Sequence, residues 1–218
     1  IANTKRILAG SVSGGMWLSA DDGKTWRPTQ ATNEFRSATC IAQDIRPNHQ
    51  QRWYMGTGEA YGQSAGARGA YYLGDGLFSS DDSGKSWQAI ASTSGGNPLT
   101  FTTGWQLVWN VVVDQSAHDT ANEIYAAIYD QIQRSSNGGK TWVSQLSGGY
   151  FTDVAVSSKG VVYATSSSDG AKKGMFRADN DGKLVNINPS FLGTTYKRIV
   201  IGIDPNNENV VYFLLVIY

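Results

Sequence analysis

Short apolar runs alternate with polar clusters rich in Gly, Asp, Asn and Ser along the whole chain. The runs are too short for typical helices, and many show the alternation, or the β-branched and aromatic residues, of strands. Gly, Asn and Asp between such runs are typical of tight turns. We therefore predict an all-β protein.

The apolar runs form groups separated by longer connections. Pairs of strands are expected at 40–44 and 52–56, at 108–114 and 123–128, and at 151–157 and 161–165. A further strand that leads into a polar turn is expected at 16–18, 77–78, 132–134 and 175–177. A last strand begins after each of these turns, so the pattern predicts four-stranded antiparallel sheets.

One polar turn has the same sequence pattern in three places. An Asp or Asn side chain accepts hydrogen bonds from nearby backbone N–H groups, and Gly supplies the positive φ of a tight turn. We expect each copy to be a structural hairpin turn whose closing Trp begins the next strand and is buried between sheets. The residues are Ser19, Asp21, Gly23, Thr25 and Trp26; Ser80, Asp82, Gly84, Ser86 and Trp87; and Ser135, Asn137, Gly139, Thr141 and Trp142.

A degenerate fourth copy covers 178–185, where Val185 replaces the Trp. Such repeats are typical of propellers and solenoids. The three full copies resemble the Asp-box, or bacterial neuraminidase repeat, of sialidases, sortilin-type receptor domains and xyloglucan-hydrolysing enzymes. With the phrases at 14–17, 54–59 and 76–78, nearly the whole chain is most similar to sortilin-like exported bacterial proteins often labelled glycosyl hydrolases. The resemblance implies a β-propeller of four-stranded antiparallel blades with Asp-box hairpins.

The repeats divide the chain into about four blades of one propeller domain, or of a segment of one. Because the first and last groups hold only part of a blade, we expect a partial ring. Strands from a longer chain or from a partner would then cover the open edges. The expected blades are 1–38 (partial), 39–91, 107–147, 150–189 and 197–218 (partial).

Composition limits the classes of partner that the chain can bind. With 18 basic and 18 acidic residues, the chain has no charge excess to attract nucleic acid. The single cysteine, Cys40, cannot form an internal disulfide and is expected to pack as a small hydrophobe. The final apolar run, 210–218, is shorter than the roughly 20 residues that span a membrane, so no transmembrane segment is expected. The family resemblance implies a secreted, periplasmic or cell-surface location.

The sequence offers no motif for a metal or a cofactor, and we expect neither. His49 and His118 lack the spaced ligands of a zinc site. The segment from Asp179 begins like a calcium loop, but Ser190 stands where the bidentate Glu belongs. Phosphate-binding loops and nucleophile elbows are also missing.

Ligand contacts are expected in the long connections 29–38, 59–75 and 91–106, which should lie opposite the box turns. Their aromatic rings suit a sugar or peptide face. The alternative is that the same rings only pack the loops onto the propeller rim. The candidate ligand-binding residues are Tyr61, Arg68, Tyr71, Tyr72, Phe101 and Trp105.

A glycosidase of the two-carboxylate type needs acids that face each other across a cleft. Glu59 and Asp75 are weak catalytic candidates, and Glu34 and Asp130 are further acids placed in loops. The Phe-Arg-Ile-Pro phrase of sialidases is missing; Phe35 and Arg36 match its first two residues, but Ser and Ala follow them.

The favoured interpretation is therefore a non-catalytic binding or scaffolding module of an exported or cell-surface protein, which recognises a protein or a glycan through its loop face. One alternative is a sialidase-like or xyloglucanase-like glycoside hydrolase with part of its active site outside this segment. Another is an accessory subunit of a larger cell-envelope complex.

Overall fold

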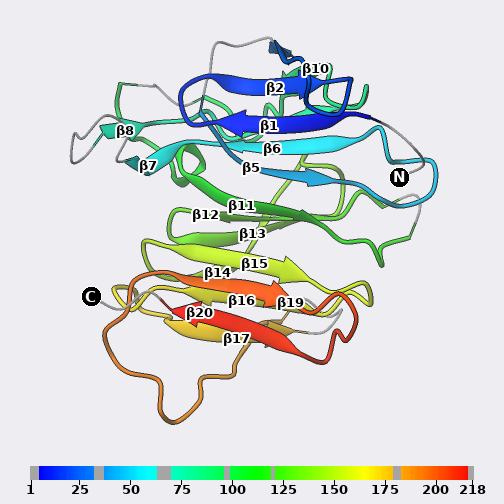
Figure 1. The fold of residues 1–218 in the computed structure, drawn as a ribbon. Helices are drawn as coiled ribbons and strands as arrows, with labels where there is room; N and C mark the ends of the chain where they lie inside the picture. Colours follow the sequence, from blue (N-terminus) through cyan, green and yellow to red (C-terminus); the bar gives the residue numbers. More distant parts are fainter. Residues whose placement is uncertain are drawn as a thin grey trace. The chain divides into compact units, whose positions relative to one another are not determined.

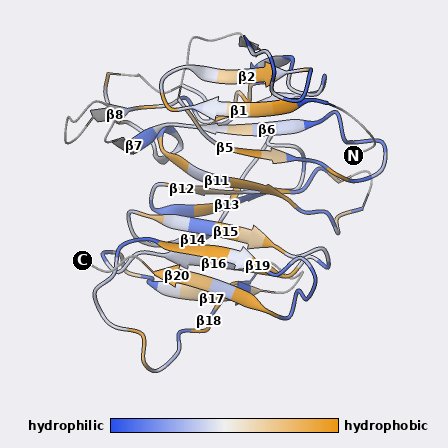
Figure 2. Ribbon diagram, in the orientation of Figure 1, coloured by the Kyte–Doolittle hydropathy of each residue, from blue (hydrophilic) through white to orange (hydrophobic). Residues whose placement is uncertain are grey.

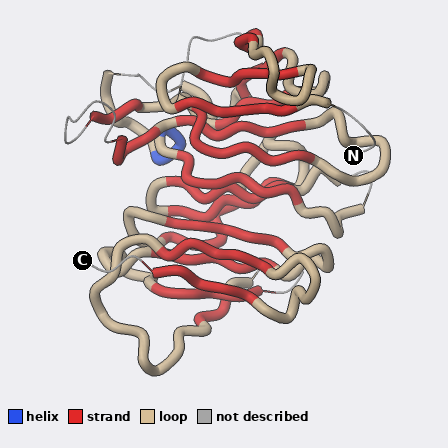
Figure 3. The backbone as a smooth tube through the Cα atoms, viewed as in Figure 1, coloured by secondary structure: helices blue, strands red, loops and turns tan. Residues whose placement is uncertain are grey.

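The computed structural model describes residues 5–31, 37–62, 70–95, 99–118, 121–178 and 183–215. The chain divides into two compact units, Ile1–Val108 and Trp109–Tyr218. Strands dominate both units, and a short 3-10 turn, η2 (Gly104–Gln106), lies near the end of the first (Figures 1 and 3).

The first unit contains two larger sheets. One is antiparallel, with strands in the order β1 (Ile7–Ser11), β2 (Gly15–Ser19) and β3 (Arg27–Pro28). In the other, the antiparallel strands are β5 (Ala38–Gln43), β6 (Trp53–Thr57), β9 (Leu77–Ser80) and β10 (Ser86–Ala89), and β4 (Gln30–Ala31) joins β10 in parallel. A small hairpin, β7 (Glu59–Gly62) and β8 (Ala70–Tyr72), lies within the connection from β6 to β9.

The second unit continues the pattern with antiparallel sheets whose neighbours follow in chain order. The first sheet begins at Val108 and holds β11 (Val108–Val113), β12 (Ile124–Ile128), β13 (Gln131–Ser135) and β14 (Val143–Ser147). The next holds β15 (Thr152–Val156), β16 (Val162–Ser166), β17 (Gly174–Ala178) and β18 (Val185–Asn186). A two-stranded sheet, β19 (Ile199–Ile203) and β20 (Val211–Leu215), follows. The predicted all-β class and the four-stranded antiparallel sheets are confirmed.

Burial on both faces explains why some strands are apolar throughout. Every residue of β12 and of β16 is buried. In the second unit β12 contacts β15, and β16 contacts β19, so each sheet is covered by the next. Figure 2 shows the apolar stretches mainly in strands and the hydrophilic residues mainly in connections.

The last hairpin is buried on one face only. Ile199 packs with Met175 and Tyr196, and Phe213 and Leu215 lie against the same cluster. On the opposite face Tyr212 is 61% exposed and Leu214 is 69% exposed. The hairpin therefore presents an apolar surface that the described residues leave uncovered.

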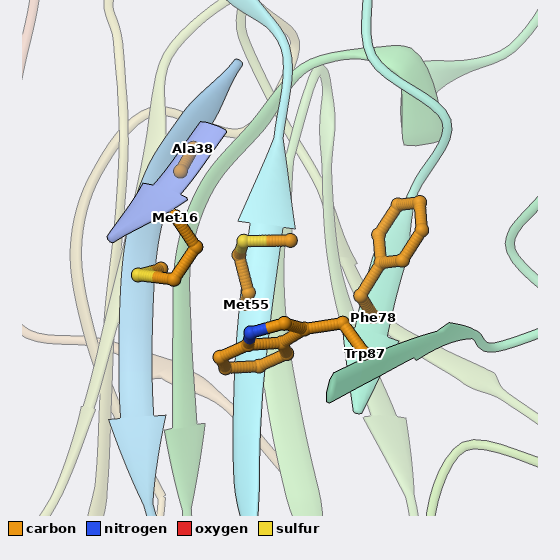
Figure 4. Packing of buried hydrophobic residues seen from close by; sticks show 5 residues of the cluster. All are labelled: Met16, Ala38, Met55, Phe78 and Trp87. Carbon is orange, nitrogen blue, oxygen red and sulfur yellow. The ribbon is translucent and has the colours of Figure 1, made fainter. Parts of the chain in front are cut away.

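The core of the first unit joins its two larger sheets. Met16 of β2 lies in one cluster with Ala38, Met55, Phe78 and Trp87 from the second sheet (Figure 4). The Trp87 ring lies beside Met55, and Leu8 of β1 packs at the edge of the cluster. This contact places the second box turn, which leads into β10, against the first sheet.

Candidate functional site

The three box turns share one hydrogen-bond network. In the second turn, Oδ1 of Asp82 accepts from the Ser80 hydroxyl at 2.8 Å and from the Ser86 backbone N–H at 3.0 Å. Its Oδ2 accepts from the Ser86 hydroxyl at 2.6 Å, and Ser80 Oγ accepts from the Gly84 N–H at 2.9 Å. Burial opposes the charge of Asp82, but the hydrogen bonds favour it and lower its pKa to about 2.

The other two turns repeat this network. Asp21 Oδ1 accepts from the Thr25 N–H at 2.9 Å, and its Oδ2 accepts from the Thr25 hydroxyl at 2.7 Å. In the third turn Asn137 Oδ1 accepts from the Thr141 N–H at 3.0 Å, while Nδ2 donates to Thr141 Oγ1 at 2.8 Å. An uncharged amide thus occupies the same place because a hydroxyl can either donate or accept.

Each box turn also contains two consecutive residues with positive φ. The pairs are Asp22 and Gly23 (60° and 82°), Ser83 and Gly84 (65° and 78°), and Gly138 and Gly139 (71° and 88°). At Gly84 a Cβ atom would also lie 2.6 Å from Leu8 Cδ1. Glycine is therefore required there both by the backbone and by the packing.

The closing tryptophans differ in burial. Trp87 is 1% exposed, which confirms the prediction for the second turn. For Trp26 the prediction is wrong, because its ring is 41% exposed, lies before β3 and donates Nε1–H to Gly23 O at 3.0 Å within its own turn. Trp87 packs against a strand of the preceding sheet, and among the described residues no such sheet precedes Trp26. Trp142 is half-buried and precedes β14.

A second repeated turn joins the first two strands of the sheets. A side-chain oxygen of the residue directly after the first strand accepts the N–H two residues later, as an Asx or Ser turn does. The sequence carries this signal, since Arg46-Pro-Asn48 and Asp204-Pro-Asn-Asn207 are typical of turns between strands. The residues are Asp44, Asp114, Ser157 and Asp204. Asp44 also pairs with the buried Arg46 guanidinium at 2.7 Å.

Two of the predicted ligand-binding connections, 59–75 and 91–106, contact each other. The Gly74 N–H donates to Gln106 O at 2.9 Å, and the Gly76 N–H donates to Trp105 O at 3.1 Å. Gly58 has φ +98°, and a Cβ there would lie 1.8 Å from Gln106 O. The residues on either side of the β7–β8 hairpin therefore lie against the end of the 99–106 segment, which carries η2. We call the hairpin and residues 99–106 the loop face (Figures 1 and 3).

Three large hydrophobic side chains among the described residues of the loop face are exposed. Tyr72 is 37% exposed, Phe101 is 45% exposed and Leu99 is 90% exposed. Trp105, on η2, is half-buried. The buried Gln106 fixes the segment beneath them, because its Oε1 accepts from the Thr102 N–H at 2.6 Å. Of the other predicted residues, Arg68 lies outside the described residues, and Tyr61 and Tyr71 are placed in β7 and β8 by their backbones alone.

The predicted acids have different surroundings. Asp75 is buried, and its carboxylate accepts from the Ser94 hydroxyl and, at 2.8 Å, from the Gly95 N–H. It thus ties the 94–95 loop to the start of β9. Glu59 is half-buried on β7 and pairs in register with Tyr72. Asp130 lies in the second unit, and Glu34 is outside the described residues.

Asp153, which the sequence reasoning missed, is a buried carboxylate at the centre of the second unit. Its Oδ1 accepts from Asn110 Nδ2 at 2.8 Å and its Oδ2 accepts from the Ile201 N–H at 3.0 Å. It therefore links strands of three successive sheets, β11, β15 and β19. Burial raises its pKa, although the hydrogen bonds from Ile201, Asn110 and Val154 oppose the shift. One Asp in a strand gave no sequence signal of this role.

Within the described ranges, no three His, Cys, Asp or Glu side chains gather as metal ligands. A search of the same residues for a helix that is long and apolar enough to cross a membrane finds none.

No protein-family model matches the chain, and neither does any curated protein. Solved structures do match. An ancestral GH74 enzyme is 22% identical with a TM-score of 0.65, over 95% of this chain and 27% of its own. An extracellular domain assigned to a one-component system of B. thetaiotaomicron is 13% identical with a TM-score of 0.60, over 96% of this chain and 24% of its own. The GH74 xyloglucanase of Xanthomonas campestris is 16% identical with a TM-score of 0.50, over 96% and 40%.

The fold is that of a β-propeller. The propeller consists of four-stranded antiparallel blades, and β1–β3 and β19–β20 are partial blades as described. The chain spans about a quarter to two fifths of the lengths of these similar proteins. At these identities the likeness shows the fold alone.

Proposed function

We propose that this propeller is a non-catalytic binding module that holds a protein segment or a glycan at the loop face. The observation that carries the proposal is the exposure of Tyr72, Leu99 and Phe101 on a backbone fixed by the buried Gln106. Exposed apolar side chains on a rigid loop can bind a ligand at a small cost in conformational entropy. The likeness to an extracellular domain supports an exported or cell-surface protein. The repeated hydrogen bonds of the three box turns support membership of the Asp-box family.

The surroundings of the acids favour binding over catalysis. Asp75 is buried with both carboxylate oxygens hydrogen-bonded, as expected for an acid that holds a loop in place. A two-carboxylate hydrolase needs one acid able to donate a proton to a bound substrate and a second acid facing it. Hydrolysis by an active site completed outside this segment is the rival explanation, and the experiment below includes it.

The uncovered face of β19 and β20 supports a further part of the proposal. Tyr212 and Leu214 are exposed here, whereas the equivalent second strand β16 is buried along its length. We infer that additional strands, from a longer chain or from a partner in a cell-envelope complex, cover this face.

The test compares binding and turnover in matched variants. The wild-type chain, the double variant Tyr72→Ala/Phe101→Ala and the control Phe191→Ala are applied to glycan and peptide arrays. Phe191 is 87% exposed in the connection before β19, so the control removes an exposed ring that belongs to the other unit. We expect the double variant to lose retention about tenfold or more, as for a small aromatic hot spot, and the control to bind as wild type does.

Turnover is measured in parallel on xyloglucan and on sialylated substrates, with Glu59→Gln as the acid variant. The proposal predicts that neither the wild-type chain nor Glu59→Gln turns over these substrates. It also predicts that Glu59→Gln is retained on the arrays as strongly as wild type. If the wild-type chain turns over a substrate and Glu59→Gln does not, the hydrolase interpretation replaces the binding module. If the double variant is retained as strongly as wild type, the loop face is not the ligand site.

A further inference from the structure

A second group of rings lies at the turn between β12 and β13. The Tyr129 ring meets the Tyr150 ring edge-on, with centroids 4.8 Å apart and planes at 77°. The centroid of the Tyr150 ring also lies 6.0 Å from that of Trp109 and 4.8 Å from that of Phe151. Trp109 is buried while both tyrosines are half-buried, so the tyrosines form the accessible part of the group.

Two carboxylates flank these tyrosines. Asp130 follows Tyr129 in the turn and has φ +64°. Asp169 is exposed, and its Oδ1 accepts from the Tyr150 N–H at 3.1 Å and from the Ser167 hydroxyl at 2.6 Å. Burial, and then the negative charge of Asp169, raise the pKa of Asp130. The two acids are therefore close enough to repel each other.

Throughout the described residues, no basic side chain forms an ion pair with either acid. Lys172 and Lys173 are exposed in the same loop as Asp169 but are not paired with it. Two carboxylates close to aromatic rings favour a cation, since the face of a ring is itself negative.

The same unit contains a similar arrangement that is filled by a cation. Arg134 Cζ lies 5.9 Å from the centroid of the Tyr125 ring, and Arg134 Nε donates to Glu123 Oε1 at 2.7 Å. The Tyr125 hydroxyl donates to the same Glu123 oxygen at 2.8 Å. A tyrosine beside a carboxylate is thus completed here by a guanidinium.

We propose that Tyr129, Asp130, Tyr150 and Asp169 form a binding site for the guanidinium group of an arginine side chain from a partner protein. A planar guanidinium can stack on a ring while its N–H groups reach carboxylates, which a compact ammonium does less well. The site shares no residue with the loop face, and its ligand is independent of the one proposed there.

The backbone around the site is fixed before any ligand binds. Ser166 Oγ accepts from the Gly149 N–H at 2.5 Å, and Ser167 Oγ accepts from the Phe151 N–H at 2.9 Å. A Cβ on Gly149 would lie 2.3 Å from Asp169 Oδ1, and one on Gly170 would lie 2.1 Å from Gly148 O. Because the loops fit this closely, the two acids stay near the rings, and little ordering is needed on binding.

The test uses the tripeptide acetyl-Gly-Arg-Gly-amide and its citrulline counterpart, which has nearly the same shape without the charge. Binding is followed by NMR titration of the backbone amides, at low salt because exposed charges are screened. We expect the arginine peptide to shift the amides of 129–130, 148–151 and 167–170. We expect the citrulline peptide to bind about five- to tenfold more weakly, as for the loss of a partly exposed charge–charge and cation–π contact.

Two variants and one control locate the site. Asp130→Asn removes one charge and suits the left-handed backbone, and Tyr129→Leu removes one ring. Each should weaken the arginine peptide about three- to tenfold. The control Asp22→Asn makes the same change at an exposed position with a similar φ, +60°, and should leave the affinity unchanged.

Stability separates a binding role from a structural one. Since Asp130 and Asp169 repel each other, Asp130→Asn should melt at the same temperature as wild type or higher, while its affinity falls. A lower melting temperature together with unchanged affinity would make Asp130 a structural residue and overturn the proposal. Equal binding of the two peptides would also overturn it, as would cellotetraose shifting these amides when the arginine peptide does not.

Discussion

Trp87 should contribute more to stability than any other residue of the box turns. Its side chain is 1% exposed and packs with Met16, Met55 and Phe78, so it joins the two larger sheets of the first unit (Figure 4). A buried Trp removes roughly 200 Å² from water, which is about 5 kcal/mol at about 25 cal/mol per Å². Alanine retains a small part of this, so Trp87→Ala should destabilise by about 3 to 5 kcal/mol.

Trp26 provides the matched control. It occupies the same place in the first box turn, but its ring is 41% exposed, and its N–H bonds within the turn. Trp26→Ala should therefore cost only about 1 to 2 kcal/mol. The two variants remove the same atoms from the same sequence motif, so the difference between them measures the greater burial of Trp87, less the turn hydrogen bond that Trp26 loses.

Urea unfolding followed by far-UV circular dichroism measures both costs, because the midpoint and slope of the transition are obtained within each variant from its own folded and unfolded baselines. Unchanged slopes against urea would show that the unfolded states are comparable. Equal costs for the two variants, or a cost below about 2 kcal/mol for Trp87→Ala, would refute the reasoning that joins this ring to the first sheet.

Three further predictions follow from polar and open surfaces. Asp82→Ala should cost about 1 to 2 kcal/mol after solvent screening, whereas Asp82→Asn should cost less, because Asn137 already serves in the third turn. The folded pKa of Asp82, about 2, lies below the unperturbed value of 3.8, so its contribution is present above pH 3.8 and is lost as the pH falls toward 2; urea unfolding across this range should show a larger loss in wild type than in Asp82→Asn. Asp153→Ala should cost about 2 to 4 kcal/mol by leaving buried donors unpaired. The folded pKa of Asp153 is raised, so ionisation at neutral pH destabilises the wild-type fold. The free energy of unfolding of Asp153→Asn, relative to wild type, should therefore be higher at neutral pH than in acid. Residues 1–218 expressed alone should self-associate, and Tyr212→Lys/Leu214→Lys should reduce this in sedimentation velocity; a monodisperse wild-type monomer would contradict the prediction.

The sequence predicts the strands well because their signals are local. The pairs at 108–114 and 123–128 are flanked by turn residues and are observed as β11 and β12. The box turns are equally local, since every partner of Asp82 in its network lies within four residues along the chain. Such features need no knowledge of tertiary contacts.

The remaining features depend on contacts between distant residues. Trp26 and Trp87 occupy the same place in the box motif, yet among the described residues only Trp87 has a preceding sheet to pack against. Asp153 meets Asn110 and Ile201 more than forty residues away, so its role is invisible in its own strand. The rings of the loop face were identified from loop length, but which of them are exposed depends on the folded structure.

The order of the strands also affects the kinetics of folding. In the second unit each antiparallel neighbour is the next strand along the chain, so that Val156 pairs with Val162, and Ser166 pairs with Gly174. Closing such short loops costs little entropy and favours fast folding. In the first unit Gly56 pairs with Leu77 across a connection that must first form its own hairpin, β7–β8. Pulse-labelled hydrogen exchange should therefore find the amides of β16 and β17 protected earlier than those of β9.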